Sequence, residues 1–373
     1  MNSSLSAEAL LETKDQTVAA NRGADVFGVI GAGFIGKMHL KALSALDVRI
    51  GAVADPSPDA RSAATQWAPD AVCYTDWRQL VADPSVTAVH ICTINSLHAE
   101  ILTAAMEAGK HVFCEKTMTI SAAEAREMMI RQTNRGQIVQ IGYMKRFFPS
   151  AVWAKERMGE IGDPICATVR SFQGGLVDEG IYDSADWRPT TDGPSRTRRF
   201  ASGGMLNMAG SHMLDMTAWL MGTPLSVRCH TWSPQGYDAE LHAHGLFRMK
   251  SGATVHFEAA LSPFSKTGVY GNGWDEWLQI DGTKGRLELF FPLWDRPADF
   301  PAKARMYLES EKAWTEPEFP AVDAFAVELK AFVEACQTGT SAAPTIRDGA
   351  VVDCWIDACY ASARSGAEVE VSI

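Results

Sequence analysis

Two side chains in this 373-residue chain combine a reactive group with a position at which chemistry is common. Lys116 follows the apolar run 111–114, so it would emerge from the end of a buried strand. Partial desolvation there would lower the pKa of its ammonium group, which could polarise a hydroxyl or carbonyl of a substrate. His212 lies in an otherwise apolar helical stretch, where an imidazole could take up a proton. A surface lysine at a strand end and a core histidine are the alternatives that position alone leaves open.

A glycine turn near the start of the chain indicates a binding site for a dinucleotide. The apolar run 26–30 is too short for a helix and ends in Gly31-x-Gly33-x-x-Gly36, after which a helical pattern begins. In such a turn Gly31 permits the tight bend, Gly33 lets a pyrophosphate approach the backbone, and Gly36 lets the helix pack close to the strand. A second apolar run ends on Asp55, at about the 20-residue distance that the motif requires.

These features predict that NAD is the cofactor. The helix that begins at Phe34 and Ile35 offers its first N–H groups and a partial positive charge to a phosphate. Asp55 could accept hydrogen bonds from the adenosine ribose, and it would repel the 2′-phosphate of NADP. A glycine turn in some other α/β sheet is the alternative.

Composition and charge exclude several classes of partner. The net charge of -11 argues against nucleic acid and anionic membranes, and no apolar stretch reaches about 18 residues, the length of a membrane span. The eight cysteines form no Cys-x-x-Cys pair and several lie in apolar runs, which favours free thiols in a reducing compartment. We therefore expect a cytoplasmic protein, in which residues 1–24 form a mobile extension without a secretory signal.

The alternation of strand and helix patterns predicts the fold class of the first domain. Apolar runs at 88–92, 111–114 and 138–141 alternate with helical patterns, two of which begin at Ser57-Pro58 and at the capping box Ser121-x-x-Glu124. Such βα units are typical of an α/β fold with a doubly wound parallel sheet. We expect this NAD-binding Rossmann domain to occupy residues 25–145.

The pattern changes after about Tyr143, which predicts a second domain over residues 146–373. Strand-like runs now follow one another at 165–172, 225–232, 242–249, 254–261, 277–281 and 285–291. Apolar helices are expected at 204–221, 322–337 and 347–364. This half therefore reads as an α+β domain with a largely antiparallel sheet.

Taken together, these motifs resemble the glucose–fructose oxidoreductase/inositol dehydrogenase (Gfo/Idh/MocA) family, over about residues 26–373. Besides the glycine turn, the matching segments are Thr93-x-Asn95-x-x-His98, Gly109-Lys110-His111-Val112-x-x-Glu115-Lys116, Trp187-Arg188, Gly203-Gly204…His212-x-x-Asp215, Ile280-x-Gly282-Thr283-Lys284-Gly285 and Ser362…Gly366…Val369. The set in this order is specific to the family, although it does not specify a substrate.

The resemblance implies a fold, a set of site residues and an assembly. The sheet of the C-terminal domain would be open and would pack against a second subunit, which predicts a homodimer or homotetramer. Lys116 and His212 would be catalytic, and the substrate would contact Lys116, Trp187, Arg188 and His212. The cofactor-binding residues would be Gly31, Gly33, Phe34, Ile35, Gly36, Asp55, Thr93, Asn95, His98, Glu115 and Lys116.

Two departures from the family pattern affect the site. The proline that usually follows the lysine is Thr117 here. The aspartate that usually lies four residues before the histidine, on the same helical face, is Met208. His212 can still act as general base while Lys116 holds the oxygen, and Asp215 is a weaker candidate for orienting His212.

The leading hypothesis is an NAD-dependent dehydrogenase that oxidises a secondary alcohol of a sugar, cyclitol or related polyhydroxylated ring. Met208 favours an NAD-binding sensor or regulatory protein on the same scaffold as the runner-up, and an NAD-dependent glycoside-cleaving enzyme is a third reading. His242 and His244 share one face of a strand but have no third ligand near them in sequence, so we expect no metal site.

Overall fold

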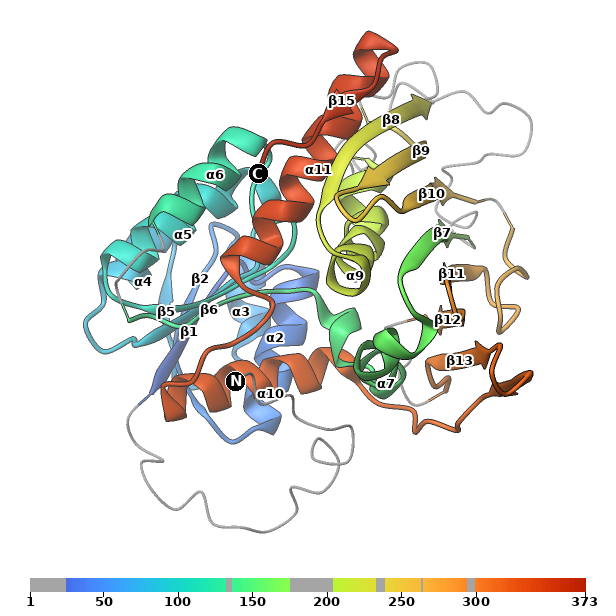
Figure 1. Ribbon diagram of the computed structural model, residues 1–373. Coiled ribbons are helices and arrows are strands. Elements are labelled where there is room, and N and C mark those ends of the chain that lie inside the picture. The colour runs from blue at the N-terminus through green and yellow to red at the C-terminus, as the bar shows by residue number, and fades with distance from the viewer. Residues whose placement is uncertain (1–24, 132–135, 175–203, 233–238, 263, 294–298) are drawn as a thin grey trace. The chain divides into compact units, whose positions relative to one another are not determined.

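The computed structural model describes residues 25–131, 136–174, 204–232, 239–262, 264–293 and 299–373 (Figure 1). Within these ranges the chain divides into two compact units, which are described separately below. One unit contains residues 25–143 and 325–353, and the other contains residues 144–324 and 354–373. The predicted boundary between residues 145 and 146 stays a prediction. The structure adds that residues 325–353 group with the N-terminal unit, although they follow the other unit in sequence.

The first unit is built on a six-stranded parallel sheet with the order β3-β2-β1-β4-β5-β6. Its strands are β1 (Val26–Ile30), β2 (Arg49–Ala54), β3 (Val72–Tyr74), β4 (Ala88–Ile91), β5 (His111–Cys114) and β6 (Val139–Ile141). Its helices are α2 (Phe34–Ala45), α3 (Pro58–Ala64), α4 (Trp77–Ala82), α5 (His98–Glu107), α6 (Ala122–Arg131) and α10 (Ala324–Thr338), and α11 (Ile346–Ser365) begins in it.

This arrangement confirms the predicted doubly wound α/β class. The strand order reverses between β1 and β4, because the chain returns from the edge strand β3 to pair β4 with β1. Every residue of β1, β4 and β6 is buried, as expected for strands covered on both faces. Ligands of such sheets bind outside the carboxyl ends of the strands at the point of reversal.

Local capping explains where two of the predicted helices begin. The side chain of Ser57 accepts a hydrogen bond from the N–H of Ala60, and Pro58 occupies the first helical position of α3. Before α6, the hydroxyl of Ser121 accepts a bond from the N–H of Glu124, and the carboxylate of Glu124 accepts one from the N–H of Ile120. The capping box therefore forms with a small shift, because its return bond ends on Ile120 instead of Ser121.

The second unit is built on a nine-stranded sheet with the order β14-β13-β12-β11-β7-β10-β9-β8-β15. These strands are β7 (Pro164–Gln173), β8 (Pro224–Trp232), β9 (His242–Met249), β10 (Thr254–Leu261), β11 (Trp274–Gly282), β12 (Gly285–Phe291), β13 (Lys303–Leu308), β14 (Ala313–Thr315) and β15 (Val369–Glu370). All neighbours pair antiparallel except β7 and β10, which are parallel. The predicted α+β class is thus confirmed.

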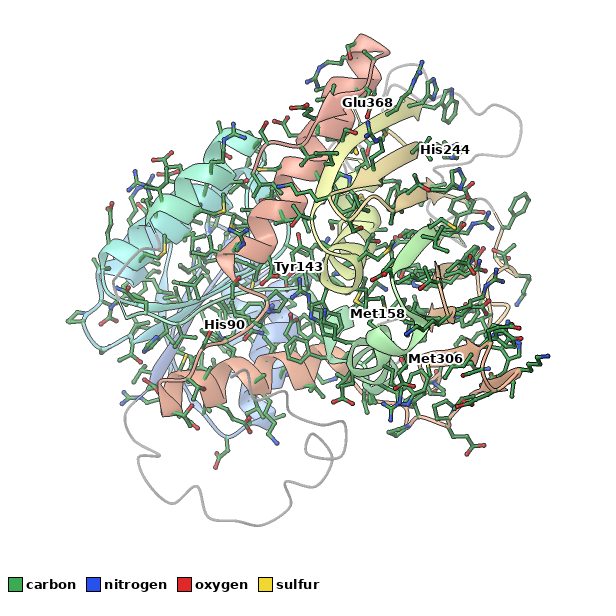
Figure 2. All side chains as sticks on the ribbon, viewed as in Figure 1. His90, Tyr143, Met158, His244, Met306 and Glu368 are labelled. Carbon is green, nitrogen blue, oxygen red and sulfur yellow. The ribbon has the colours of Figure 1, made fainter. Side chains whose placement is uncertain are left out.

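Burial alternates along the strands of this second sheet. In β9 and β10 the positions Ala243, Phe247, Val255 and Phe257 are buried, while the residues between them are mostly exposed. Figure 2 labels His244 on β9 at one of the exposed positions. Helix α9 (Ser211–Met221) contributes buried residues to the same unit, and helix α7 (Pro149–Arg157) belongs to it as well.

None of the described helices combines the length and the hydrophobicity that crossing a lipid bilayer requires. All eight cysteines lie among the described residues and are free thiols, and only Cys73 is exposed.

Candidate active site

The glycine turn between β1 and α2 has the geometry that each glycine was expected to provide. Gly31 adopts a φ of 88°, and a Cβ atom there would lie 2.6 Å from the carbonyl oxygen of Cys92. A Cβ on Gly36 would lie 1.9 Å from the carbonyl oxygen of Gly31, so the helix packs directly against the turn. A Cβ on Gly33 would meet no atom within 4 Å, which leaves space for a ligand beside the backbone. The turn therefore fits a bound pyrophosphate.

The first turn of α2 completes an anion-binding arrangement. Phe34 and Ile35 begin the helix, Gly33 occupies the N-cap position, and the first turn contains no acidic residue that would repel a phosphate. Phe34 is 68% exposed, so its large ring adds an uncovered apolar surface at the same turn.

Asp55 follows β2 and fixes the neighbouring backbone. Its Oδ2 accepts a hydrogen bond of 2.7 Å from the N–H of Ala32, and its Oδ1 accepts one of 2.8 Å from the N–H of Ser57. A carboxylate oxygen has a second acceptor site, so both oxygens keep capacity for ribose hydroxyls. Asp55 therefore holds Ala32, within the glycine turn, against the end of β2.

The segment that carries Lys116 continues from the carboxyl end of β5 and is held by side chains that follow β4. The amide of Asn95 donates to the hydroxyl of Thr117 over 2.8 Å. Nδ1 of His98 lies 2.7 Å from the carbonyl oxygen of Thr117, and its Nε2 lies 3.1 Å from that of Thr93. The predicted cofactor residues Thr93, Asn95 and His98 therefore come together around Thr117, next to Lys116.

The electrostatics of His98 follow from its burial. The side chain is 0% exposed, and burial lowers its pKa, while the two carbonyl oxygens of Thr117 and Thr93 act in the opposite direction. In its neutral form the ring has one N–H, so it donates to one of these carbonyls at a time. His98 thus acts as a clamp on the backbone of the lysine segment.

Glu115 is a buried member of the same segment, with only 9% of its surface exposed. Its Oε1 lies 3.0 Å from Nε2 of His39, and its Oε2 accepts a hydrogen bond of 3.2 Å from the N–H of Lys116. Nδ1 of His39 lies in turn 2.9 Å from Nδ1 of His90. The sequence analysis did not single out His39 or His90, although His39 stands between Met38 and Leu40 in α2 and His90 stands between Val89 and Ile91 in β4.

A further contact holds the chain just beyond the lysine. The N–H of Thr119 donates to Oδ2 of Asp353 over 2.7 Å, and the hydroxyl of Thr119 lies 2.9 Å from the same oxygen. Asp353 is almost completely buried on α11, and burial raises the pKa of its carboxyl to about 8. It is the second buried acid, after Glu115, that anchors this segment.

The predicted base His212 lies in the second unit, one residue into α9. It is half-buried, and α9 is preceded by a π-helical turn, Leu206–Gly210, that contains the half-buried Met208. Such turns are frequent at functional sites. The other predicted substrate residues, Trp187 and Arg188, lie outside the described residues.

A buried acid fixes the π-helical turn before His212. Oε1 of Glu240 accepts a hydrogen bond of 2.8 Å from the N–H of Leu206, and the hydroxyl of Tyr360 lies 3.1 Å and 3.0 Å from the two carboxylate oxygens. The amide of Asn207 donates to that hydroxyl over 3.1 Å. Burial raises the pKa of Glu240, and burial together with Glu240 raises the pKa of Tyr360. A Cβ on Gly204 would lie 2.1 Å from Oε2 of Glu240, so only glycine fits there.

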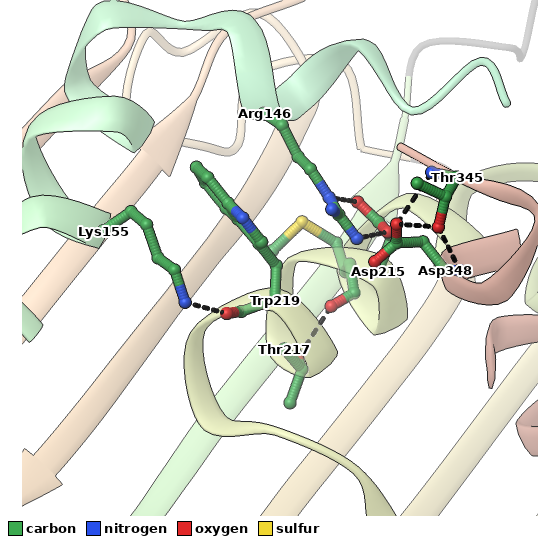
Figure 3. Close-up of polar contacts among 8 residues, drawn as sticks. Arg146, Lys155, Asp215, Thr217, Trp219, Thr345 and Asp348 are labelled. Atoms are coloured by element: carbon green, nitrogen blue, oxygen red, sulfur yellow. Dashed lines mark hydrogen bonds and ion pairs between the residues drawn. The ribbon is translucent and has the colours of Figure 1, made fainter. Parts of the chain in front are cut away.

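Asp215, one turn beyond His212 on α9, is bound by a guanidinium group (Figure 3). Nε of Arg146 donates to its Oδ2 over 2.8 Å, and an Nη atom donates to its Oδ1 over 2.5 Å. The Asp215 side chain is completely buried, so this two-point pair compensates a buried charge. The structure therefore shows Asp215 as the ion-pair partner of Arg146. Its suggested role in orienting His212 stays a prediction.

The described residues contain no group of three or more His, Cys, Asp or Glu side chains that could hold a metal ion. The rings of His242 and His244 are 6.3 Å apart, and Nε2 of His242 lies 3.2 Å from the carbonyl oxygen of Leu261.

Both halves of the chain match models of known protein families. Residues 26–143 match a family model described as "Oxidoreductase family, NAD-binding Rossmann fold", and residues 156–288 match one described as "GFO/IDH/MocA C-terminal domain".

Similar proteins extend over nearly the whole chain. The inositol 2-dehydrogenase of Gluconacetobacter diazotrophicus is 30% identical over 353 residues, which cover 91% of this chain and 94% of that protein. The D-xylose 1-dehydrogenase (NADP(+)) 2 of Haloferax volcanii is 27% identical, covering 93% of this chain and 99% of that protein. Among solved structures, levoglucosan dehydrogenase in complex with NADH and L-sorbose superposes with a TM-score of 0.77 at 23% identity, over 93% of this chain and 99% of that one.

Proposed function

Because this chain belongs to the Gfo/Idh/MocA family of oxidoreductases, we propose that it oxidises a secondary alcohol of a sugar, cyclitol or related polyhydroxylated ring. The chain is an NAD(P)-dependent oxidoreductase acting on CH–OH groups. The names of its relatives support the substrate class, since inositol, xylose and levoglucosan are all polyhydroxylated rings. The observation that carries the proposal is the lysine segment, which Asn95 after β4, His39 on α2 and Asp353 on α11 hold at the carboxyl edge of a dinucleotide-binding sheet.

NAD supplies the hydride acceptor, and the first unit supplies its binding groups. The pyrophosphate is assigned to the backbone at Gly31, Gly33, Phe34, Ile35 and Gly36, and the adenosine ribose is assigned to Asp55. Thr93, Asn95, His98, Glu115 and Lys116 form the nicotinamide side of the site, where most of them also fix the backbone of residues 115–117. Asp55 favours NAD, although the name of one relative specifies NADP(+).

Lys116 and His212 carry the proton chemistry in this proposal. His212 takes the proton of the reacting hydroxyl, and the positive charge of Lys116 stabilises the negative charge that develops on the oxygen. Trp187 and Arg188 bind the substrate. Because Met208 stands where the family pattern has an aspartate, His212 works here without that acid.

Assembly and location complete the proposal. Ile165 on β7, Leu225 and Trp232 on β8 and Leu246 on β9 are large apolar side chains that the second sheet exposes. A homodimer or homotetramer that covers them with a second copy would remove these side chains from water. Eight free thiols support a cytoplasmic location.

The test is steady-state kinetics with NAD on a panel of myo-inositol, D-xylose, levoglucosan and related polyols, followed as NADH absorbance. Lys116→Ala and His212→Ala should each lower turnover by about a hundredfold or more, which is typical for the loss of an electrostatic or acid–base group. NAD binding should survive in His212→Ala. Lys250→Ala, which changes an exposed lysine in the turn between β9 and β10, is the matched control and should behave like the wild type.

Wild-type turnover in both Lys116→Ala and His212→Ala would refute the assigned roles. NAD binding without NADH production on any polyol would favour the sensor reading that Met208 suggests.

A further inference from the structure

Two histidines of the first unit lie in a pocket of aromatic rings, where a polar group needs a partner. His39 on α2 and His90 on β4 are both 0% exposed. The ring of His39 packs edge-on against Phe113 and Phe325, at centroid distances of 5.1 Å and 4.9 Å, and His90 stacks on Phe113 at 5.3 Å. Burying imidazoles in such surroundings is costly unless their nitrogens are hydrogen-bonded.

The two rings form a chain of hydrogen bonds that ends at the lysine segment. Nδ1 of His90 faces Nδ1 of His39 at 2.9 Å, and Nε2 of His39 faces Oε1 of Glu115 at 3.0 Å. Oε2 of Glu115 then accepts the backbone N–H of Lys116. The first two links join different elements, so side chains connect α2 both to β4 and to the end of β5, in addition to the backbone pairing of β4 with β5.

Which nitrogen of each histidine carries the proton follows from one buried atom that has no hydrogen-bond partner among the described residues. Burial lowers the pKa of His90, so this ring is neutral and carries a single proton. Its Nε2 is buried and has no hydrogen-bond partner among the described residues. A buried N–H without an acceptor is rarer and more costly than a buried lone pair, so the proton belongs on Nδ1. His90 therefore donates to Nδ1 of His39, which leaves Nε2–H of His39 to donate to Glu115.

This order of donors immobilises the carboxylate of Glu115. His39 holds one oxygen and the N–H of Lys116 holds the other. A Cβ on Gly142 would lie 3.2 Å from Oε2, so the carboxylate also packs against the backbone at the end of β6. A side chain fixed at three points transmits its position to the adjoining peptide.

We propose that His39, held in its Nε2–H tautomer by His90, is a positioning residue for Lys116. It connects α2, whose first turn is assigned to the pyrophosphate, to the segment that presents the lysine. This inference rests on the proposed catalytic role of Lys116. In the absence of His39 the Glu115 carboxylate loses its fixed donor, and the lysine backbone loses its rigid acceptor.

Three variants test the proposal by kinetics. His39→Leu removes the donor, whereas His39→Gln places an amide N–H close to the position of Nε2. We expect His39→Leu to lower kcat by about 10- to 100-fold, the cost of a misplaced catalytic group, with NAD affinity close to that of the wild type. His39→Gln should recover most of the turnover. His111→Leu is the control, since His111 accepts the N–H of Ile138 over 2.9 Å at the other end of β5, and should lower thermal stability alone.

A spectroscopic measurement tests the proton order without any substrate. In protein labelled with ¹⁵N-histidine, NMR should show His90 protonated at Nδ1 and His39 protonated at Nε2, with signals assigned by the variants His39→Gln and His90→Gln. The opposite tautomers, or a doubly protonated His39, would overturn the assignment.

The kinetic outcomes separate this inference from the proposed function. Normal kcat in His39→Leu together with an inactive Lys116→Ala would overturn the role of His39 alone. Normal kcat in Lys116→Ala would overturn both. Equal losses in His39→Leu and His39→Gln, with a matching loss of folded protein, would reduce His39 to a packing residue.

Discussion

Replacing Asp353 by asparagine tests whether a buried carboxyl group beside the lysine segment stays neutral at pH 7. The hydroxyl of Thr119 lies 2.9 Å from Oδ2 of Asp353 and 3.0 Å from the carbonyl oxygen of Ser121. One hydroxyl proton cannot serve both acceptors. If Asp353 carries a proton on Oδ2, it donates to Thr119, and Thr119 donates to Ser121. The geometry therefore favours the neutral acid, in agreement with a pKa of about 8.

The expected effect on stability follows from the difference between the pKa of Asp353 in the folded protein and its pKa in the unfolded chain. The folded pKa of about 8 lies above the ordinary value of 3.8, so the proton binds more tightly to the folded protein. The stabilisation by the protonated carboxyl is fully present below about pH 4 and is lost as the pH rises through about 8. Each pH unit inside this window costs up to about 1.4 kcal/mol, which gives an upper value of about 2.7 kcal/mol between pH 5 and 7.

Thermal unfolding of wild type and Asp353→Asn at a series of pH values measures this slope. The melting temperature of the wild type should fall relative to the variant by up to about 5 to 10 °C between pH 5 and 7, because about 1 kcal/mol corresponds to 2–4 °C in a unit of this size. Asp357→Asn, on the same helix, is the control. A difference in melting temperature that stays constant with pH would refute a neutral Asp353.

Two further predictions concern the cofactor site. Asp55→Ala should weaken NAD binding and reduce the preference for NAD over NADP, because it removes the ribose acceptor and the anchor of Ala32. Fluorescence titration with both cofactors measures these affinities. Tighter binding of NADP than of NAD by the wild type would contradict the assignment. Gly36→Ala should destabilise the first unit by about 1–3 kcal/mol and abolish NAD binding, because its Cβ overlaps the Gly31 carbonyl. Gly33→Ala should lower the affinity for NAD but keep the melting temperature of the wild type. Equal stability losses in the two variants would count against the distinct roles of these glycines.

The fold was largely predictable because its strongest signals are local. The strands predicted at 242–249, 254–261 and 285–291 have the bounds of β9, β10 and β12, since alternating burial and short turns leave a clear period in the sequence. β3 was not predicted, because its three residues are partly exposed and its pairing with β2 supplies what its own pattern lacks. The helix predicted at 204–221 begins with a π-helical turn, which residue periodicity does not indicate.

The grouping of residues 325–353 with the first unit depends on contacts that no local pattern contains. Helix α10 supplies Phe325 and Phe332, whose rings lie 4.9 Å from His39 and 5.2 Å from His90. The apolar face of this helix was predicted correctly, but an apolar face does not say which sheet it covers.

The positions of the glycine turn, Asp55 and Lys116 were predictable from the sequence. The side chains that hydrogen-bond to the lysine segment were not. Motif spacing places each of the predicted positions at a strand end, and parallel strands bring those ends to one edge of the sheet. Their supporting bonds join residues far apart in sequence, since Glu115 lies 76 positions after His39 and Asp353 lies 234 positions after Thr119. The periodicity of apolar residues is a local signal and does not predict contacts over such separations.

One general rule would nevertheless have found the two histidines. His39 shares the buried face of α2 with Gly36, Leu40 and Leu43, and His90 is the polar residue of an otherwise apolar strand; a buried polar group implies a partner. The doubly wound topology places the fourth strand beside the first, with the intervening helix packed on the sheet, so α2 and β4 were predictable neighbours. Two histidines on neighbouring buried elements are each other's simplest partner. The remaining nitrogen of His39 then requires an acceptor near the end of the next strand, and Glu115 directly follows that strand, just before the lysine.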